Sequence, residues 1–558
     1  MNDLYAQQIV HHLVQQGVRR VCIAPGSRST PLVYACAQED RLEKTIHFDE
    51  RGAAFYAYGY AKGSKTPVAL ICTSGTAIAN LFPAVIEAYL DEVPLIIITS
   101  DRPPELRDCG ANQTCDQTKF FGTYTRWYFE IPCPDSDMPQ GFIGSTIAQA
   151  VFRATHTPRG PVHLNCLFRE PFLSGERTPS IPSTHYDSGQ LTLPPSLCEQ
   201  WAKKLSQCEQ GVILVGAFST NRSLRSIFSL AEHLDWPILP DIMSGLRSEG
   251  MHPNVIPYYD IVLKTLPHLR PDCILQFGDR IVSKPVIKWI EKFPPPLYAM
   301  VADHPFRHDP AHLLTHRVQC DPTLFAELIL HGLSRRPSWL SHWKNISQVV
   351  EGHIDEFIPS ASEPGILRFL HHHLPPHYAF FAANGMPVRD ADQFFFPRFH
   401  RGPIFGKRAA AGIDGNIATI VGLAEGANRP ICAIIGDQTA LHDLNSLPLL
   451  HKSKVPILLL IINNQGGGIF SFLPIAEKKE MFENYWAAAH NWRFEEAAKM
   501  FRLPYLALTD PSQLSRLFQS EKTIIVECKT NRAENRALHH GIEENIKAKI
   551  MTLAGALV

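Results

Sequence analysis

The sequence predicts an α/β protein built from three doubly wound parallel-sheet domains. Short runs of apolar, often branched residues recur through the 558 residues, and helical patterns separate them. Such alternation is typical of parallel strands joined by crossover helices. Several runs end directly in glycine and polar residues, at the edge where ligands bind in open parallel sheets. The chain is too long for one hydrophobic core, and its length indicates about three domains.

Composition and charge point to a globular enzyme that acts on small molecules. The chain is 45% hydrophobic and 19% charged, with a formal net charge of −1. This balance favours neither nucleic acid nor an anionic membrane as a partner. No apolar run approaches the roughly 20 residues of a membrane span, and the N-terminus lacks the features of a signal peptide. The 13 cysteines stand singly, as thiols do in a reducing compartment, so we expect a cytoplasmic protein.

The strand patterns divide the chain into three predicted domains, which cover residues 1–180, 190–340 and 350–558. A segment rich in Ser, Thr and Pro at 174–196 is typical of an interdomain linker. The central domain has a Rossmann-like rhythm without a G-x-G-x-x-G motif, so nucleotide binding is not favoured there. Strands are predicted at 21–24, 46–48, 68–72, 94–99, 160–165, 212–215, 237–240, 272–277, 298–302, 377–382, 431–435, 457–462 and 523–528.

Two predicted helices of the first domain carry local signals. The residues at 51–62 are rich in alanine and glycine, which indicates close packing against a neighbouring helix. A second helix is expected to begin near Pro31. The hydroxyls of Ser27, Ser29 and Thr30 are available to cap it.

The stretch around Asp437 and Asn464 predicts a cation site. Asp437 follows the predicted strand at 431–435, and Asn464 follows the one at 457–462. Their separation, 464 − 437 = 27 residues, is about one crossover, so the two side chains can meet at neighbouring strand ends. With a backbone carbonyl from the glycines at 466–468, they would offer Mg²⁺ hard oxygen ligands. The N–H groups after Asp437 suit a diphosphate. An ordinary Rossmann-like half with a glycine-rich turn is the alternative.

This stretch resembles the signature of thiamine-diphosphate enzymes, which begins with Gly-Asp-Gly and ends with Asn-Asn. Gln438 stands in place of the second glycine. The residues His47-Phe48-Asp49-Glu50 resemble the glutamate element of the same enzymes. The resemblance implies that Glu50 hydrogen-bonds the aminopyrimidine ring of thiamine diphosphate from a neighbouring subunit. There it promotes the imino tautomer, which takes the proton from C2. A homodimer or homotetramer with active sites at the subunit interface is therefore implied.

Further motifs are similar to those of one family of these enzymes, the 2-succinyl-5-enolpyruvyl-6-hydroxy-3-cyclohexene-1-carboxylate (SEPHCHC) synthases. They are the segments 24–32, 100–106, 110–113, 412–415 and 464–470. The resemblance spans the first and third domains and is thin in the central one. It implies decarboxylation of 2-oxoglutarate on thiamine diphosphate and 1,4-addition of the succinyl carbanion to isochorismate. The products would be SEPHCHC and CO₂, a step of menaquinone biosynthesis.

The resemblance also implies which residues hold the cofactor and the metal. Glu50 and Gln113 would be catalytic, and Mg²⁺, or Mn²⁺ in its place, would be bound by Asp437, Asn464 and the Gly466 carbonyl. Ile413 would force the cofactor rings into their bent shape, and Ile469, Phe470 and Leu473 would pack the pyrimidine and the donor side. The complete implied cofactor set is Glu50, Ile413, Asp437, Gln438, Thr439, Asn464, Gly466, Ile469, Phe470 and Leu473.

Both implied substrates are dianions, so several cations are expected in one cleft, preferably arginines. Arg389 and Arg408 would hold the distal carboxylate of 2-oxoglutarate. Pro285 and Gly385 stand where some relatives have a basic residue and a serine, and each removes a polar contact. The implied isochorismate site is formed by Ser27, Arg28, Arg102, Asn112, Gln113 and Lys284.

Three other functions fit parts of the sequence. The nearest is another thiamine-diphosphate-dependent 2-ketoacid decarboxylase or an acetolactate-type carboligase, which would need fewer cations at the strand ends. A non-catalytic binding protein of the same fold is opposed by the intact Glu50 and cation ligands. A nucleotide-binding regulatory protein would use the central domain and carry a bound flavin or adenine nucleotide.

Overall fold

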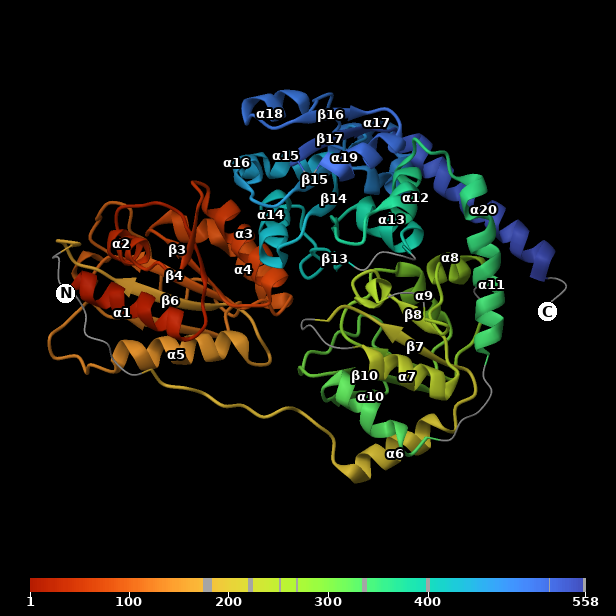
Figure 1. Cartoon of the computed structure of the whole chain (residues 1–558), viewed down its shortest axis with the longest axis horizontal. Helices are drawn as coiled ribbons and strands as arrows, with labels where there is room; N and C mark the ends of the chain where they lie inside the picture. Colours follow the sequence, from red (N-terminus) through yellow and green to blue (C-terminus); the bar gives the residue numbers. More distant parts are fainter. Residues whose placement is uncertain are drawn as a thin grey trace. The chain divides into compact units, whose positions relative to one another are not determined.

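The protein is described by a computed structural model that covers residues 1–173, 183–218, 224–249, 252–266, 269–333, 339–397, 402–520 and 522–554. It contains three parallel sheets of six, five and six strands, which confirms the predicted α/β class (Figure 1). The chain forms two compact units. The first unit is Met1–Ser188, Ala409–Arg429 and Thr439–Ile457, and the second is Gly189–Arg408, Pro430–Gln438 and Leu458–Val558. The predicted domain boundaries remain predictions.

The first unit contains the first sheet, with strand order β2-β1-β3-β4-β6-β5. β3 and β4 are buried along their whole length, because they are central and covered on both faces. The strand predicted at 46–48 is wrong: β2 ends at Ile46, and the chain then turns toward Asp49, the cap of the next helix. The strands are β1 (Arg20–Ile23), β2 (Glu43–Ile46), β3 (Val68–Cys72), β4 (Leu95–Asp101), β5 (Trp127–Ile131) and β6 (Val162–Leu167).

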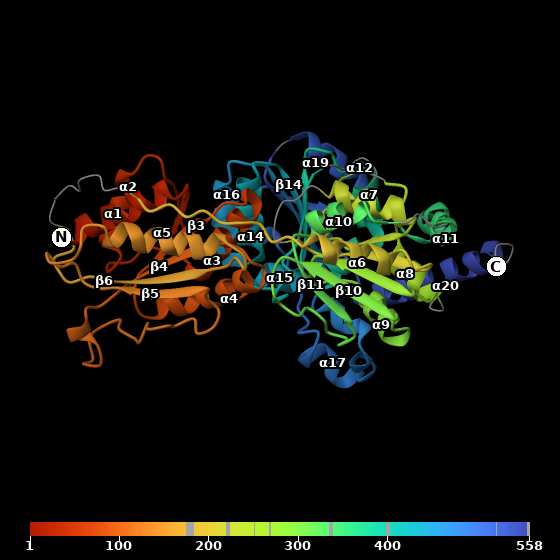
Figure 2. The ribbon, with the colours of Figure 1, turned by 90° about the horizontal axis from the view of Figure 1, so that it is seen from below.

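Helices cover both faces of the first sheet. α1, α2 and α5 share one hydrophobic core with the sheet, and α5 lies along β5 and β6 (Figure 2). The predicted capping of α2 is wrong, because the Ser29 hydroxyl donates to the Gly26 carbonyl instead of accepting from the helix. The helices are α1 (Asn2–Gln15), α2 (Thr30–Gln38), α3 (Glu50–Ser64), α4 (Thr76–Leu90), α5 (Phe142–Thr155), α14 (Asn416–Ala427) and α16 (Leu447–Lys452), and α15 (Asp437–His442) begins in the second unit.

α3 and α14 pack so closely in the first unit that their backbones touch (Figure 1). A Cβ atom added at Gly59 would lie 2.2 Å from the Thr419 carbonyl oxygen, and one at Gly422 would lie 2.2 Å from the Tyr56 carbonyl oxygen. Neither position has room for a side chain, since backbone atoms on a neighbouring helix cannot rotate away. This packing confirms the close helix contact predicted from the small residues at 51–62, and it ties residues far apart in sequence into one unit.

A buried carboxylate fixes the start of α14. Asp443 accepts hydrogen bonds from the Ala418 N–H at 3.0 Å and from the Ser446 hydroxyl at 2.8 Å. Its side chain is 1% exposed. Burial raises the pKa of Asp443 to about 6, although its hydrogen bonds act in the opposite direction.

The second unit contains the second and third sheets. Their strand orders are β11-β10-β9-β7-β8 and β13-β12-β14-β15-β17-β16. The second sheet is β7 (Gly211–Val215), β8 (Ile238–Pro240), β9 (Cys273–Phe277), β10 (Leu297–Ala302) and β11 (His316–Gln319). The third sheet is β12 (Ala379–Ala382), β13 (Ile404–Phe405), β14 (Ile431–Gly436), β15 (Ile457–Asn463), β16 (Tyr505–Leu508) and β17 (Ile524–Lys529).

One hydrophobic core runs through both sheets of the second unit, from Leu214 in β7 to Phe380 in β12 and Val526 in β17. The predicted linker at 174–196 lies partly outside the described residues; in its described part, 183–196, residues 183–194 have neither helix nor strand, and the last two residues begin α6. The helices are α6 (Pro195–Leu205), α7 (Arg225–Leu234), α8 (Tyr259–Thr265), α9 (Lys284–Lys292), α10 (Pro322–Leu330), α11 (Leu340–His353), α12 (Glu363–His373), α13 (Met386–Phe394), α17 (Lys479–Tyr485), α18 (Glu495–Met500), α19 (Leu514–Ser520) and α20 (Arg532–Ala554).

None of the helices in the part of the chain that the structure describes combines the length and the apolar character of a transmembrane span. All 13 cysteines are free.

Replacing Gly422 by alanine tests the contact between α3 and α14. We expect Gly422→Ala to lower the free energy of unfolding by about 1–3 kcal/mol, because the added methyl group forces the two backbones apart. The matched control is Gly352→Ala in α11, where an added Cβ meets no atom within 4 Å. Alanine should stabilise that helix by up to about 1 kcal/mol. Denaturant unfolding measures both, and equal effects at the two positions would contradict the packing argument.

Asp443 predicts a pH dependence of stability. Its folded pKa of about 6 lies above the ordinary value of 3.8, so folding favours the protonated form. The free energy of unfolding of the wild type should therefore fall by about 2–3 kcal/mol relative to that of Asp443→Asn as the pH rises from about 4 to above 6. The quantity to measure is the difference between the two unfolding free energies at each pH, since other groups titrate equally in both. A difference that does not change with pH would refute the assignment.

Candidate functional site

The candidate site of the second unit lies at the carboxyl ends of β14 and β15, which are neighbours in the third sheet. Asp437 follows β14 and Asn464 follows β15. The Gly466 N–H donates to Asp437 Oδ2 at 2.9 Å, so the two strand ends are in contact. Both side chains are buried, with 2% and 9% exposure. Burial raises the pKa of Asp437, and the hydrogen bonds to its carboxylate oppose this.

The oxygen atoms at these strand ends fit a hard divalent cation. Asn464 Nδ2 donates to Glu363 Oε1 at 3.0 Å, so Asn464 Oδ1 is directed away from that contact. This Oδ1 is buried and has no hydrogen-bond partner among the described residues. A buried acceptor without a donor is costly, and a cation would satisfy it. A carboxylate and an amide oxygen are ligands that Mg²⁺ accepts.

The glycine loop after Asn464 has no space for side chains. Gly466 has a φ of +145°, and a Cβ there would lie 2.5 Å from the Ala487 carbonyl oxygen. A Cβ at Gly468 would lie 2.6 Å from Asn464 Nδ2. Arg532 donates to the carbonyl of Asn464 at 2.8 Å and also to the carbonyl of the next residue. The backbone that would present the Gly466 carbonyl is therefore held on both sides.

Two residues at this site were not predicted from the sequence. Glu363, at the first position of α12, is 3% exposed. Burial and the nearby charge of Asp390 raise the pKa of Glu363 to about 7. His490 Nε2 lies 3.4 Å from Asp437 Oδ2, and both of its ring nitrogens are buried without a hydrogen-bond partner in the described structure. No motif marks either residue, because each reaches the site only through the tertiary fold.

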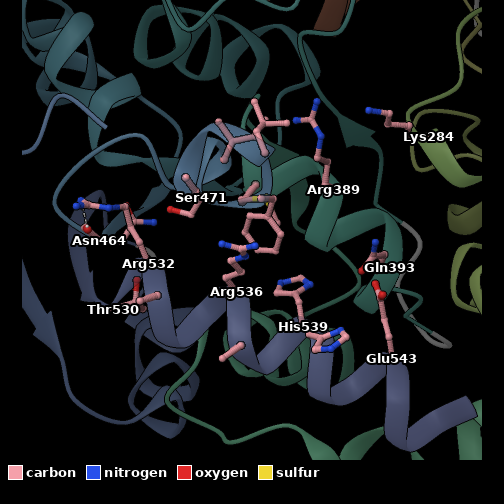
Figure 3. Close-up of a pocket in the computed structure, with 18 of the residues that line it drawn as sticks. Lys284, Arg389, Gln393, Asn464, Ser471, Thr530, Arg532, Arg536, His539 and Glu543 are labelled. Carbon is pink, nitrogen blue, oxygen red and sulfur yellow. Dashed lines mark hydrogen bonds between the residues drawn. The ribbon is translucent and has the colours of Figure 1, made fainter. Parts of the chain in front are cut away.

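A pocket of 1210 Å³ opens beside Asn464 in the second unit. It brings together five of the predicted residues, namely Lys284, Arg389, Asn464, Ile469 and Leu473. Figure 3 shows Lys284 and Arg389 on the side opposite α20. From α20, the side chains of Arg532, Arg536, His539 and Glu543 extend into the same space.

Hydrogen bonds fix the surroundings of two cations of this pocket, Lys284 and Arg389. Ser283, which caps α9 next to Lys284, donates its hydroxyl to Asp260 at 2.6 Å. Arg389 donates to the Gly385 carbonyl. Burial and the neighbouring charge of Arg408 lower the pKa of Arg389. Two like charges thus lie near each other, and the charge of Asp390 offsets part of their repulsion.

Other predicted substrate residues gather in the first unit at the carboxyl ends of β1, β3 and β4. Arg102 donates to the Ser74 hydroxyl, and Gln113 Nε2 donates to the Ser74 carbonyl at 3.0 Å. Arg28 donates to the Phe168 carbonyl at 3.0 Å. Burial and the nearby charge of Arg28 lower the pKa of Arg102. The remaining two predicted residues here, Ser27 and Asn112, are exposed.

Glu50 is the first residue of α3, and Asp49 caps this helix by accepting from the N–H groups of Arg51 at 2.9 Å and Gly52 at 3.3 Å. Asn80 Nδ2 donates to Glu50 Oε2 at 3.3 Å. The half-buried carboxylate is thereby oriented but not enclosed.

The predicted cofactor residues are divided between the two units. Glu50, Ile413 and Thr439 belong to the first. Ile413 is 37% exposed. The second unit holds Asp437, Gln438, Asn464, Gly466, Ile469, Phe470 and Leu473. The Gln438 N–H donates to Asp437 Oδ1 at 2.6 Å, so one of the N–H groups that were predicted to suit a diphosphate is already used.

A separate cluster of Asp279, His304 and His308 in the second unit has the composition of a metal site. The Phe306 N–H donates to His304 Nδ1 at 3.2 Å, and Arg280 donates to His308 Nε2 at 3.3 Å. Each ring therefore carries its proton on the nitrogen that faces Asp279, where it donates to the carboxylate. A metal ion needs a lone pair at that position. The two histidines therefore act as hydrogen-bond donors to the Asp279 carboxylate and not as metal ligands.

Models of three thiamine pyrophosphate enzyme domains match the chain. They are the N-terminal TPP binding domain at residues 4–120, the middle domain at 186–382 and the C-terminal TPP binding domain at 381–526. The structure is similar to that of benzoylformate decarboxylase from Polynucleobacter necessarius, with a TM-score of 0.72 at 15% identity, over 95% of this chain and 99% of that one. This similarity concerns the fold alone.

Curated relatives match nearly the whole chain. The 2-succinyl-5-enolpyruvyl-6-hydroxy-3-cyclohexene-1-carboxylate synthase of Rubrobacter xylanophilus is 42% identical, over 96% of this chain and 97% of its own length. Proteins of the same name from Salinibacter ruber and Chlorobium phaeobacteroides are 37% and 36% identical, each over 98% of this chain.

Proposed function

Because the chain belongs to the SEPHCHC synthase family, thiamine-diphosphate-dependent transferases of menaquinone biosynthesis, we propose that it decarboxylates 2-oxoglutarate and adds the succinyl fragment to isochorismate. The products are SEPHCHC and CO₂. The observation that carries this proposal is the pocket of the second unit, where Lys284 and Arg389 line the same cavity as Asn464. Cations beside a hard-oxygen centre suit dianionic substrates that react next to a metal-bound diphosphate.

The cofactor is thiamine diphosphate, and we propose that Mg²⁺ anchors it, with Mn²⁺ as an alternative ion. Asp437, the unpaired Asn464 Oδ1 and the Gly466 carbonyl would hold the ion. When bound, thiamine diphosphate supplies the electron sink for breaking the bond between the carboxylate carbon and C2 of the 2-oxo acid. Ile469 and Leu473 line the adjacent pocket and would exclude water from the reacting carbon.

Glu50 would hold and transfer the proton at its carboxylate, in the orientation that the Asn80 amide gives it. Gln113, fixed by the Ser74 carbonyl, would direct its side chain toward the acceptor substrate. Since these residues belong to the first unit and the cation ligands to the second, we propose a homodimer or homotetramer with each site completed by Glu50 from a second copy. The exposed Ile413 supports such an arrangement.

The substrates would be recognised through two pairs of like charges. Arg28 and Arg102, with Ser27, Asn112 and Lys284, would bind isochorismate, and Arg389 with Arg408 would bind the distal carboxylate of 2-oxoglutarate. In each pair, burial and then the like charge of the neighbouring arginine lower the pKa of one member. A carboxylate between two guanidinium groups removes that repulsion and gains charge-assisted hydrogen bonds. An acetolactate-type synthase is not favoured, because the named relatives have the other activity.

The 13 free cysteines support a reducing compartment, and we propose the cytoplasm.

The activity is tested by giving the purified protein thiamine diphosphate, Mg²⁺ and 2-oxoglutarate, with and without isochorismate. We expect CO₂ release to be fastest with both substrates and the adduct to be detected by mass spectrometry. Glu50→Gln should lose at least about a hundredfold in turnover, because an amide cannot carry the proton, while cofactor binding is mostly retained. CO₂ release without any adduct would favour the decarboxylase alternative, and near-normal turnover of Glu50→Gln would refute the role of Glu50.

The assignment of the two arginine pairs predicts a split in Michaelis constants. Arg389→Gln should raise the KM for 2-oxoglutarate about tenfold or more and leave that for isochorismate nearly unchanged, since a charged hydrogen bond contributes about 1.5–3 kcal/mol. Arg102→Gln should raise the KM for isochorismate and leave that for 2-oxoglutarate nearly unchanged. Arg536→Gln is the control, because it removes a charge from the pocket without a proposed substrate contact. Equal effects of all three variants on both substrates would refute the assignment of the two arginine pairs to different substrates.

A further inference from the structure

Glu363 is a buried carboxylate that meets the cation site from a distant part of the chain. Its Oε1 accepts from Asn464 Nδ2 at 3.0 Å and from the Thr530 hydroxyl at 2.8 Å. We propose that Glu363 is a positioning residue of the metal site, which selects the orientation of the Asn464 amide that presents Oδ1 to the cation. This inference rests on the proposed function, in that Asn464 is taken as a cation ligand.

The argument begins with the chemistry of the amide group. The two ends of an asparagine amide have nearly the same shape, but one end donates hydrogen bonds and the other accepts them. Glu363 Oε1 accepts from two donors, so the end of Asn464 that faces it is the NH₂ group. The opposite end is then Oδ1, which is buried and has no hydrogen-bond partner in the part of the chain described. If the amide were reversed, two N–H groups would face the cation and one ligand would be lost.

Both hydrogen bonds end on the same oxygen of Glu363. A proton on Oε2 would therefore leave the orientation of Asn464 unchanged. The proposed role depends on the acceptor at Oε1 and does not depend on whether the carboxyl group is charged.

Rigid elements hold the three side chains together. β15 and β17 are neighbours in the third sheet, and the Thr530 N–H donates to the Asn463 carbonyl at 3.2 Å. Asn464 and Thr530 therefore extend from adjacent strand ends. Ser362 caps α12 by accepting from the Gly365 N–H at 3.0 Å. A Cβ at Gly365 would lie 2.1 Å from the Pro359 carbonyl oxygen, so the start of the helix packs directly against the preceding backbone. Outer groups that orient metal ligands are commonly built in this way.

The test measures Mg²⁺ affinity by calorimetry, on the full-length protein with thiamine diphosphate at a fixed saturating concentration. Glu363→Ala should weaken Mg²⁺ binding by about 10-fold to 100-fold, the usual cost of removing a group that orients a ligand. Glu363→Gln keeps a carbonyl acceptor and should bind Mg²⁺ within a few-fold of the wild type. Thr530→Val is the control, since it removes the other hydrogen bond to Oε1 and leaves the amide contact in place. Circular dichroism and thermal unfolding exclude loss of the fold.

An exchange of the two partners distinguishes positioning from general support of the structure. Asn464→Asp places a second carboxylate against Glu363 and should weaken Mg²⁺ binding. The double variant Asn464→Asp with Glu363→Gln restores a donor–acceptor pair with the roles reversed, and should recover affinity about tenfold relative to Asn464→Asp alone. A double variant no better than Asn464→Asp, or wild-type affinity in Glu363→Ala, would overturn the proposal. If Asn464→Leu binds Mg²⁺ like the wild type, the proposed metal site itself fails.

Discussion

The buried ion pair between Arg247 and Asp392 joins the second and third sheets, and the pocket of the second unit depends on it. The two side chains are 1% and 2% exposed, and their charged atoms are 2.5 Å apart. Removing two charges from water is costly unless every polar atom is paired. Here Arg247 also donates to the carbonyls of Pro240, Ala391, Asp392 and Phe395, and Tyr259 donates to both oxygens of Asp392. Burial nevertheless raises the pKa of Asp392 to about 7, with Arg247 opposing it.

The same network fixes the spacing of the pocket cations. Asp392 lies in α13, one turn after Arg389, while Arg247 belongs to the second sheet's loops. Asp241, from those loops, accepts the Val282 N–H close to Lys284. Lys284 begins α9 and Arg389 lies in α13, yet both are close to the same buried set of charges. Arg389 donates one of its guanidinium N–H groups to the Gly385 carbonyl. Side chains ordered in advance lose less conformational entropy when they bind a carboxylate.

The sequence predicts those features that depend on local pattern and on chain connectivity. The strands at 68–72 and 457–462 are recognisable because central parallel strands are apolar throughout. Asp437 and Asn464 could be placed together because one crossover separates them. The short edge strands β5, β13 and β16 were not predicted, since their residues are half-buried or too few to form a pattern. Glu363 could not be found either, because 101 residues separate it from Asn464. Nor could the sequence reveal that Gly59 and Gly422 join α14 to the first unit, since only the tertiary contact makes them necessary.

Both units contain a pair of arginines that repel each other, and this shared feature connects the fold with the reaction. Burial first, and then the charge of Arg28, lower the pKa of Arg102 in the first unit, while Asp101 and Glu170 act in the opposite direction. In the second unit, burial and the charge of Arg408 lower the pKa of Arg389, and Asp390 opposes them. A protein gains no stability from such pairs, because burial and like charge both oppose the charged state. Their retention is explained if anions occupy the space between the guanidinium groups during function. Under the proposed function, the two separate pairs would serve the two dianionic substrates, 2-oxoglutarate and isochorismate. A decarboxylase with one monoanionic substrate would have no use for the second pair.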